Sequence, residues 1–205
     1  MSAPRLFIIA GPNGSGKSLF SKVLTGKKLN VFDGDKHMSS LVKQFPETGS
    51  EALWSYIDSN IFMAEKLDAI HHGSDYAFET NFSSSDRMSS ARQFKEKGYE
   101  VHLIFMGLNS IEESIQRVEQ RVQLGGHKVA EPSIRYNYEH GYKNLYKYFR
   151  EFDSVSLYDN SIPNIAAPQV PEEILYITGG ELHLNMKKYP DWVSPLMKAI
   201  NGSSI

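Results

Sequence analysis

Short apolar runs alternate along the chain with segments in which apolar residues recur every three or four positions. The runs are typical of strands buried on both faces, and the recurring positions predict amphipathic helices. Strands are expected at residues 6–10, 29–32, 76–78, 101–106 and 155–158. Helices are expected at residues 17–24, 51–72, 85–97, 110–124, 131–149 and 192–200. Because strands alternate with helices, the pattern predicts an α/β fold with a mostly parallel five-stranded sheet and helices on both faces.

The C-terminal part of the chain has a different pattern. Residues 161–171 contain three prolines and predict a linker, which is followed by a hairpin at residues 174–184 across Gly179-Gly180. A chain of 205 residues is long enough to bury a single hydrophobic core. We therefore expect one domain over residues 1–205, with a core at residues 1–160 and a small C-terminal linker, hairpin and helix at residues 161–205.

The composition argues against a disordered chain and against a nucleic-acid partner. Hydrophobic residues make up 40% of the chain and charged residues 22%, as in average globular proteins, so disorder is excluded. The formal net charge of -2 argues against a nucleic-acid partner, since such proteins usually carry a basic surplus. Tyr138, Tyr142 and Tyr146 repeat every four residues on one expected helix, and we expect them to pack against the protein rather than to stack on bases.

The chain contains no cysteine, which excludes a disulfide framework, a thiolate metal site and a cysteine nucleophile. The apolar run that begins at Leu6 ends at Gly11, so it is too short for a signal peptide. No stretch reaches the roughly 18 apolar residues of a membrane span. These features predict a cytoplasmic protein with no membrane partner.

One glycine-rich segment matches a phosphate-binding motif at every fixed position. It lies between an expected buried strand and an expected helix and follows the pattern G-x-x-x-x-G-K-[ST]. Its small residues let successive backbone N–H groups point at phosphate oxygens, and the helix N-terminus adds positive potential. Lys17 would reach the β- and γ-phosphates, and the Ser18 hydroxyl would bind Mg²⁺. The sequence therefore predicts that ATP and Mg²⁺ bind at Gly11, Pro12, Asn13, Gly14, Ser15, Gly16, Lys17 and Ser18.

Acidic residues follow two of the other expected strands. Asp33 and Asp35 come after the second strand and Glu79 after the third, whereas the strand at residues 101–106 has no acid at its end. Since the C-terminal ends of parallel strands share one edge, these carboxylates are expected near the γ-phosphate. Asp35 could accept the proton of an attacking hydroxyl group. The alternative is that Asp33-Gly34-Asp35 is only a turn with an Asp as helix N-cap.

A basic segment surrounds a pair of glycines in the second half of the chain. Two of its arginines are four residues apart and share a helix face. A helix–loop–helix that holds such charges over a phosphate site can stabilise the phosphoryl group during transfer. The alternative is a solvated helix face, because Glu113 lies four residues before the first arginine. The sequence leaves open which residue contacts the transferred phosphate among Arg117, Arg121, His127 and Arg135.

The order of these features resembles the zeta toxin family of P-loop kinases over about the first 160 residues. The phosphate-binding loop is followed by an acidic turn, a block with Glu and Asn, an arginine segment with a GGH sequence, and a last strand. The GGH sequence resembles the lid of a zeta-like subgroup. The matching blocks in this chain are GPNGSGKS, FDGD, FETNFSS, RVEQRVQLGGHKV with IRY, and SLYDNS.

The resemblance implies a P-loop NTPase-type kinase fold and an ATP-dependent kinase that phosphorylates a hydroxyl group of a small molecule. Lys17 would be a catalytic residue that binds the phosphates, and Ser18 would bind Mg²⁺. Asp33, at the end of the second strand, is predicted as a further magnesium ligand. Asp35, the last acid of the FDGD block, would be the catalytic base.

The resemblance also implies a substrate and a partner. Glu79 and Asn81 would lie in the substrate pocket, and Arg117 and Arg121 would stabilise the transferred phosphoryl group. The well-known toxins of the family phosphorylate UDP-N-acetylglucosamine and are blocked by a small antitoxin. A UDP-N-acetyl sugar is therefore the candidate acceptor, and a protein antitoxin is a candidate partner.

Three other functions stay open on the sequence. The acceptor could instead be a nucleoside, a cofactor or an antibiotic. A regulatory module that only binds ATP would need Lys17 and Ser18 but no base at Asp35. An RNA-acting kinase would need a basic groove, which a net charge of -2 does not favour.

Overall fold

A computed structural model of the chain describes residues 2–26, 29–126, 128–161, 170–186 and 188–202. The expected contribution of His127 and most of the expected linker at residues 161–171 therefore lie outside the described residues. In the described part of the chain, no helix is both long enough and apolar enough to cross a membrane.

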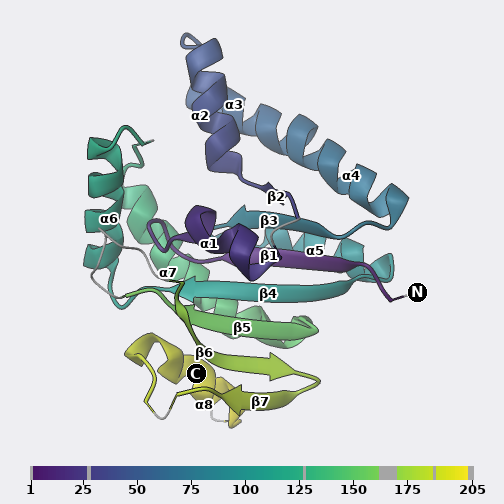
Figure 1. Ribbon diagram of the computed structural model, residues 1–205. Helices are drawn as coiled ribbons and strands as arrows, with labels where there is room; N and C mark the ends of the chain where they lie inside the picture. The colour runs from purple at the N-terminus through teal and green to yellow at the C-terminus, as the bar shows by residue number, and fades with distance from the viewer. Residues whose placement is uncertain (1, 27–28, 127, 162–169, 187, 203–205) are drawn as a thin grey trace.

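The described strands form one twisted sheet in the order β2-β3-β1-β4-β5-β6-β7 (Figure 1). The first five of these strands run parallel, which confirms the mostly parallel α/β fold. These strands are β1 (Arg5–Ala10), β2 (Val31–Phe32), β3 (Tyr76–Thr80), β4 (Glu100–Gly107) and β5 (Ser154–Asp159).

The prediction of a five-stranded sheet with a separate hairpin was wrong. The hairpin strands β6 (Glu172–Thr178) and β7 (Glu181–Leu184) continue the same sheet, so that it has seven strands among the described residues. β6 pairs antiparallel with β5 along its length. Without β6, the backbone N–H and C=O groups of β5 would form an open sheet edge, so pairing satisfies them.

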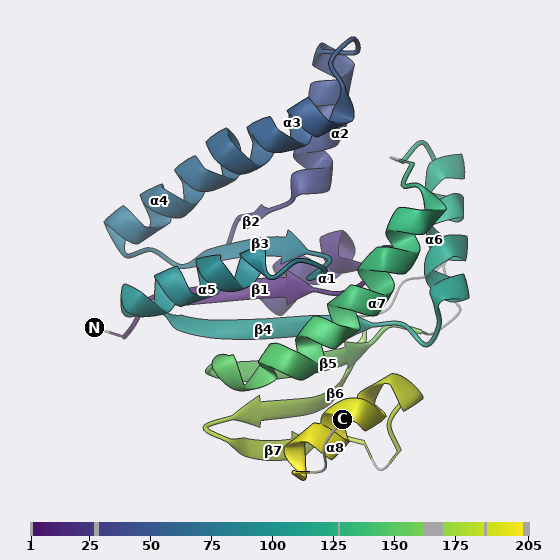
Figure 2. The same ribbon diagram turned by 180° about the vertical axis from the view of Figure 1, so that it is seen from behind.

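Helices cover both faces of the sheet, as predicted. The face seen in Figure 2 carries α5, α7 and α8, and the opposite face carries α1 (Figure 1). The helix α6 stands beside the C-terminal ends of the parallel strands. The bounds are α1 (Lys17–Leu24), α5 (Asp86–Glu96), α6 (Ile111–Gln123), α7 (Glu131–Tyr148) and α8 (Ser194–Ile200), with short 3₁₀ turns at Phe149–Glu151 and Asp191–Val193.

A helical arm extends from the β2 edge of the sheet. The expected helix at residues 51–72 is present as α3 (Ser50–Tyr56), a π-helical segment (Ile57–Phe62) and α4 (Met63–His72). It ends at Gly73, which has a φ of 61° as a helix C-cap.

The arm also contains α2 (Gly34–Gln44), which the sequence analysis did not predict. The segment Asp33-Gly34-Asp35 is therefore the start of a helix rather than only a turn. The helix forms because the Asp33 side chain accepts a hydrogen bond from the Lys36 N–H at 3.2 Å, as an N-cap does.

The core fixes the end of β1, where the phosphate-binding loop starts. β1 is buried on both faces: Leu6 and Ile8 belong to the larger hydrophobic cluster, and Ile9 packs with Phe20 of α1. The tyrosine stripe of α7 packs against the larger cluster too, with Tyr142 buried and Tyr138 and Tyr146 partly buried. The expectation that these tyrosines pack against the protein is confirmed.

Candidate phosphoryl-transfer site

The loop between β1 and α1 has backbone conformations that favour glycine. Gly14 and Gly16 have φ values of 76° and 90°, in the left-handed region. A Cβ atom at Gly16 would lie 2.6 Å from Nδ2 of Asn160, so the Asn160 side chain would have to move to accept any other residue there. The loop therefore has the glycine-dependent, curled backbone that the phosphate-binding motif predicts.

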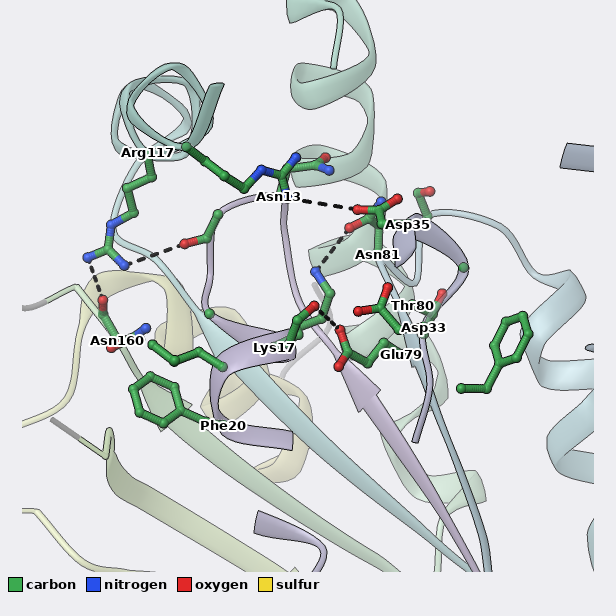
Figure 3. Close-up of a pocket in the computed structure, with 18 of the residues that line it drawn as sticks. Asn13, Lys17, Phe20, Asp33, Asp35, Glu79, Thr80, Asn81, Arg117 and Asn160 are labelled. Carbon is green, nitrogen blue, oxygen red and sulfur yellow. Dashed lines mark hydrogen bonds and ion pairs between the residues drawn. The ribbon is translucent and has the colours of Figure 1, made fainter. Parts of the chain in front are cut away.

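Lys17 extends from the start of α1 back across this loop. Its Nζ donates hydrogen bonds to the carbonyl oxygens of Gly11 at 2.8 Å and Pro12 at 3.0 Å, and to Oδ1 of Asn81 at 3.1 Å. Burial lowers the pKa of Lys17, and the negative charges of Glu79 and then of Asp35 and Asp33 oppose this shift. The ammonium group thus lies among the carboxylates of Asp33, Asp35 and Glu79, which together form an acidic edge of the site (Figure 3).

Glu79 contacts the predicted magnesium ligand. It belongs to β3, next to β1 in the sheet, and its Oε2 accepts a hydrogen bond of 2.7 Å from the Ser18 hydroxyl. Burial raises the pKa of Glu79, the charge of Asp33 adds to this rise, and the hydrogen bond from Ser18 opposes it. The sequence analysis predicted Glu79 near the γ-phosphate and in the substrate pocket, and the structure places it in the lining of the cavity described below, beside Ser18.

The acidic edge fits a magnesium ion that is bound together with a nucleotide. Oδ2 of Asp33 and Oε1 of Glu79 are buried without a hydrogen bond, and Nζ of Lys36 forms an ion pair of 3.3 Å with Oδ2 of Asp33. Among the residues that the structure describes, no group of three or more His, Asp or Glu side chains could hold a metal alone. Mg²⁺ in nucleotide sites usually takes one or two protein ligands and completes its shell with water and phosphate oxygens.

Asp35 and Arg121 face each other across the opening of the site. Asp35 lies in the first turn of α2, and its Oδ2 is 3.9 Å from Nη1 of Arg121 on α6. Both side chains are partly exposed, at 40% and 39%. Asp35 is therefore held at the edge of the cavity beside a positive charge, where an acceptor hydroxyl could reach it.

Arg117 points to a different part of the site. Its guanidinium donates to Oε1 of Glu113 and to the carbonyl oxygen of Asn160, both at 2.6 Å, and approaches the Gly14 carbonyl at 3.5 Å. Arg135, on α7, pairs with Glu131 at 2.8 Å. Of the described basic residues that the sequence singled out, only Arg121 is paired with Asp35.

One cavity of about 690 Å³ holds most of these groups. The phosphate-binding loop lines one part of it, and the arm helices line another. A second cavity of about 670 Å³ opens on the other side of Asp35 and shares with the first Asn13, Asp35, Trp54 and Asn81. The predicted site residues that line the first cavity are Asn13, Gly14, Gly16, Lys17, Ser18, Asp33, Asp35, Glu79, Asn81, Arg117 and Arg121.

Sequence reasoning missed three polar contacts of the loop. Nδ2 of Asn160 donates to the Ser15 carbonyl at 2.9 Å, and Nδ2 of Asn137 donates to Oδ1 of Asn13 at 2.9 Å. The Ser114 hydroxyl donates to the Asn13 carbonyl at 2.6 Å. Asn160 directly follows β5, so the rule that strand ends share one edge could have found it. Asn137 and Ser114 lie within helices and carry no such signal.

Two solved structures from different systems have a fold similar to that of this chain. A structure of the PezAT chromosomal toxin–antitoxin system of Streptococcus pneumoniae matches with a TM-score of 0.61 and 16% identity, over 78% of this chain and 69% of that chain. The AvrRxo1-ORF1:AvrRxo1-ORF2 structure with sulphate ions matches with a TM-score of 0.68 and 17% identity, over 90% of this chain. This match spans only 61% of that chain. Both confirm the P-loop kinase-like fold.

Sequence comparison gives the family. A curated protein of Haemophilus influenzae is 29% identical over 133 residues, which are 62% of this chain and 88% of that protein; it is described as an uncharacterized protein. The family model of the zeta toxin matches residues 1–162. This range contains the phosphate-binding loop, the acidic edge and the arginine helix, and the chain belongs to the zeta toxin family.

Proposed function

We propose that this protein is an ATP-dependent kinase that transfers the γ-phosphate of ATP to a hydroxyl group of a small molecule. The observation that carries the proposal is a single cavity lined by Lys17, Ser18, Asp35 and Arg121. It combines a phosphate cradle, a carboxylate and an arginine, which are the groups that phosphoryl transfer requires. Membership of the zeta toxin family supports the same conclusion. An AvrRxo1-ORF1:-ORF2 structure solved with ATP, which covers 89% of this chain, adds support.

The proposed nucleotide site uses the loop and the acidic edge. The backbone N–H groups of residues 11–16 and the Lys17 ammonium bind the β- and γ-phosphates. Ser18, Glu79 and Asp33 would hold a magnesium ion together with the phosphates. Bound there, Mg²⁺ neutralises charge on the phosphate oxygens.

In the proposed reaction, the acceptor oxygen forms a bond to the γ-phosphorus while the bond to the β–γ bridging oxygen breaks. Asp35 orients the acceptor hydroxyl and takes its proton, so that the products are ADP and a phosphorylated acceptor. Arg121 lies beside Asp35 and stabilises the negative charge on the phosphoryl oxygens as the group moves.

The acceptor is proposed to bind between the arm and α7. There the cavities are lined by small polar side chains such as Ser83 and Ser133 and by the aromatic rings of Trp54 and Tyr136. Hydroxyl-rich ring compounds suit such a mixed lining, because ring faces pack on aromatic side chains and hydroxyl groups find hydrogen-bond partners. A UDP-N-acetyl sugar is the first candidate from the family, and a nucleoside, a cofactor or an antibiotic is the alternative.

A small protein antitoxin is the proposed partner. The support comes from the family and from the similar fold of a protein in the PezAT toxin–antitoxin system. A protein that covers the cavity opening beside Asp35 and Arg121 would exclude ATP.

The test is a metabolite screen for ATP-dependent phosphorylation, with UDP-N-acetylglucosamine as the first acceptor. Wild type and Asp35→Asn are compared, with the exposed α7 residue changed in Lys143→Ala as the matched control. We expect a phosphorylated product with wild type and Lys143→Ala only. If wild type binds Mg-ATP but phosphorylates no metabolite, the protein is a regulatory ATP-binding module instead.

A further inference from the structure

The turn that follows β3 has an unusual backbone conformation. Phe82 has a φ of 57°, and it is the only non-glycine residue in the described ranges with a positive φ. A bulky side chain rarely adopts this left-handed conformation, which persists only where the surroundings enforce it. The side chain of Phe82 is fully buried, with its ring centroid 6.4 Å from that of Tyr148 and 6.3 Å from that of Phe152.

One face of α7 enforces this conformation. Nδ2 of Asn144 donates a hydrogen bond of 2.8 Å to the Phe82 carbonyl oxygen. Three residues earlier, Gly141 leaves room for the backbone of Asn81, because a Cβ atom at Gly141 would lie 2.6 Å from the Asn81 carbonyl oxygen. A spacing of three residues puts both contacts on the same side of the helix.

Two further hydrogen bonds fix the ends of the turn. The N–H of Phe82 donates to Oγ1 of Thr80 at 2.9 Å. The Ser83 hydroxyl donates to Oδ1 of Asn137 at 2.7 Å, and Asn137 lies one turn before Gly141 on α7. Residues 80–83 are thus bound to a rigid helix on one side and to their own strand on the other.

The turn sets the direction of the Asn81 side chain. Its Oδ1 lies 3.1 Å from Nζ of Lys17, between the phosphate-binding loop and Asp35 (Figure 3). Asn81 also lines both cavities, so its amide is located where the nucleotide and the acceptor would meet. A small rotation of the Phe82 backbone would turn this amide away.

We propose that Asn144 and Gly141 are positioning residues, which hold the left-handed turn at Phe82 and thereby place Asn81 against Lys17. The effect on catalysis rests on the proposed kinase function, while the effect on the turn does not. Asn144 lines neither cavity, and its side chain donates to the Phe82 carbonyl, so it acts through the turn that holds Asn81.

The kinetic test measures turnover of Mg-ATP in Asn144→Ala, with Lys143→Ala as the control on the adjacent, exposed position. We expect kcat to fall by about tenfold to a hundredfold, because a misplacement of about 1 Å in a catalytic site has effects of this size. KM for ATP should change by less than about threefold, since the loop itself is intact. A wild-type kcat in Asn144→Ala overturns the proposal.

A double-mutant cycle separates positioning from a general structural effect. If Asn144 acts through Asn81, the double variant Asn81→Ala with Asn144→Ala should be no slower than Asn81→Ala alone. If the two losses multiply, Asn144 does not act through Asn81 and the proposal fails.

A crystal structure of Asn144→Ala without any ligand gives a readout that is independent of the kinase function. We expect φ of Phe82 to leave the left-handed region and the distance from Asn81 Oδ1 to Lys17 Nζ to increase. An unchanged turn overturns the proposal even if the protein is a kinase. Conversely, a wild type that binds no Mg-ATP refutes the kinase function and leaves this readout valid. If Asn144→Ala does not fold, Gly141→Ala is measured in its place, with the same expected change.

Discussion

The Ser18 hydroxyl donates a hydrogen bond of 2.7 Å to Glu79, although the two residues are 61 positions apart in the chain. The bond connects the start of α1 to the end of β3, because β3 is the neighbour of β1 in the sheet. If Ser18 binds the proposed magnesium ion, a carboxylate at this place would orient its hydroxyl group toward the ion.

Glu79→Gln should therefore weaken magnesium binding more than nucleotide binding. We expect the Mg²⁺ concentration for half-maximal activity to rise by about tenfold to a hundredfold, as for other residues that orient a metal ligand. The measurement is turnover of ATP against magnesium concentration. An unchanged magnesium dependence would argue against a role in magnesium binding and would favour the role in substrate binding that the sequence analysis predicted for Glu79.

Lys17→Ala should lose most of the affinity for Mg-ATP. The variant removes a charge-assisted contact to phosphate, which is worth about 2 kcal/mol or more. Isothermal titration calorimetry compares the variant with wild type, and Lys22→Ala on the exposed face of α1 is the control. Equal affinities in Lys17→Ala and wild type would refute the nucleotide site.

Asp35→Asn should keep Mg-ATP binding and lose phosphoryl transfer. The amide preserves the shape of the side chain but cannot accept the proton, so we expect a fall of about a hundredfold to ten-thousandfold in turnover. Asp35 lies in the first turn of α2, where an acidic charge stabilises the helix dipole by only about 0.3–1 kcal/mol, so a role limited to this helix would leave activity intact. Full activity would then point to Asp33 or Glu79 as the base.

Arg121→Ala and Arg117→Ala should have different effects. Arg121 is paired with Asp35, and its loss should reduce turnover by about a thousandfold with little change in ATP affinity. Arg117 bonds to Glu113 and to the Asn160 carbonyl, so its loss should reduce the free energy of unfolding by about 1–2 kcal/mol. Steady-state kinetics and urea denaturation of both variants test this; equal losses of turnover would contradict it.

Asp75→Asn should lower the free energy of unfolding relative to wild type, and this loss should be larger at neutral pH than at acidic pH. Burial would raise the pKa of Asp75, but the hydrogen bonds from Arg5 outweigh it and hold that pKa below its ordinary value. The stabilisation by Asp75 is thus complete above the pKa of the unfolded carboxyl and is lost as the pH falls through the lower, folded pKa.

Because the Arg5–Asp75 pair is partly exposed, we expect a difference of only about 1 kcal/mol at pH 7 in the free energy of unfolding. The difference should vanish in strong acid. Urea denaturation at both pH values measures it, and the same difference at low pH would show that the charge of Asp75 is not the cause.

The sequence alone determined the five parallel strands, most helices and the phosphate-binding loop. These features depend on local rules: continuous apolar runs for strands such as residues 101–106, three- and four-residue spacing for helices, and glycines where the backbone must be left-handed. The family also followed from short motifs in a fixed order. No long-range contact is needed to read any of these signals.

Only the tertiary structure decided how the secondary-structure elements and the site side chains are arranged relative to one another. The hairpin joined the sheet because the edge of β5 needed a partner. Arg117 and Arg121 share a helix face, but their guanidinium groups point in different directions. Arg117 binds the Asn160 carbonyl and Arg121 pairs with Asp35, and these two partners lie on different sides of the loop. Such choices depend on contacts between residues that are far apart in the chain, so the local pattern could not contain them.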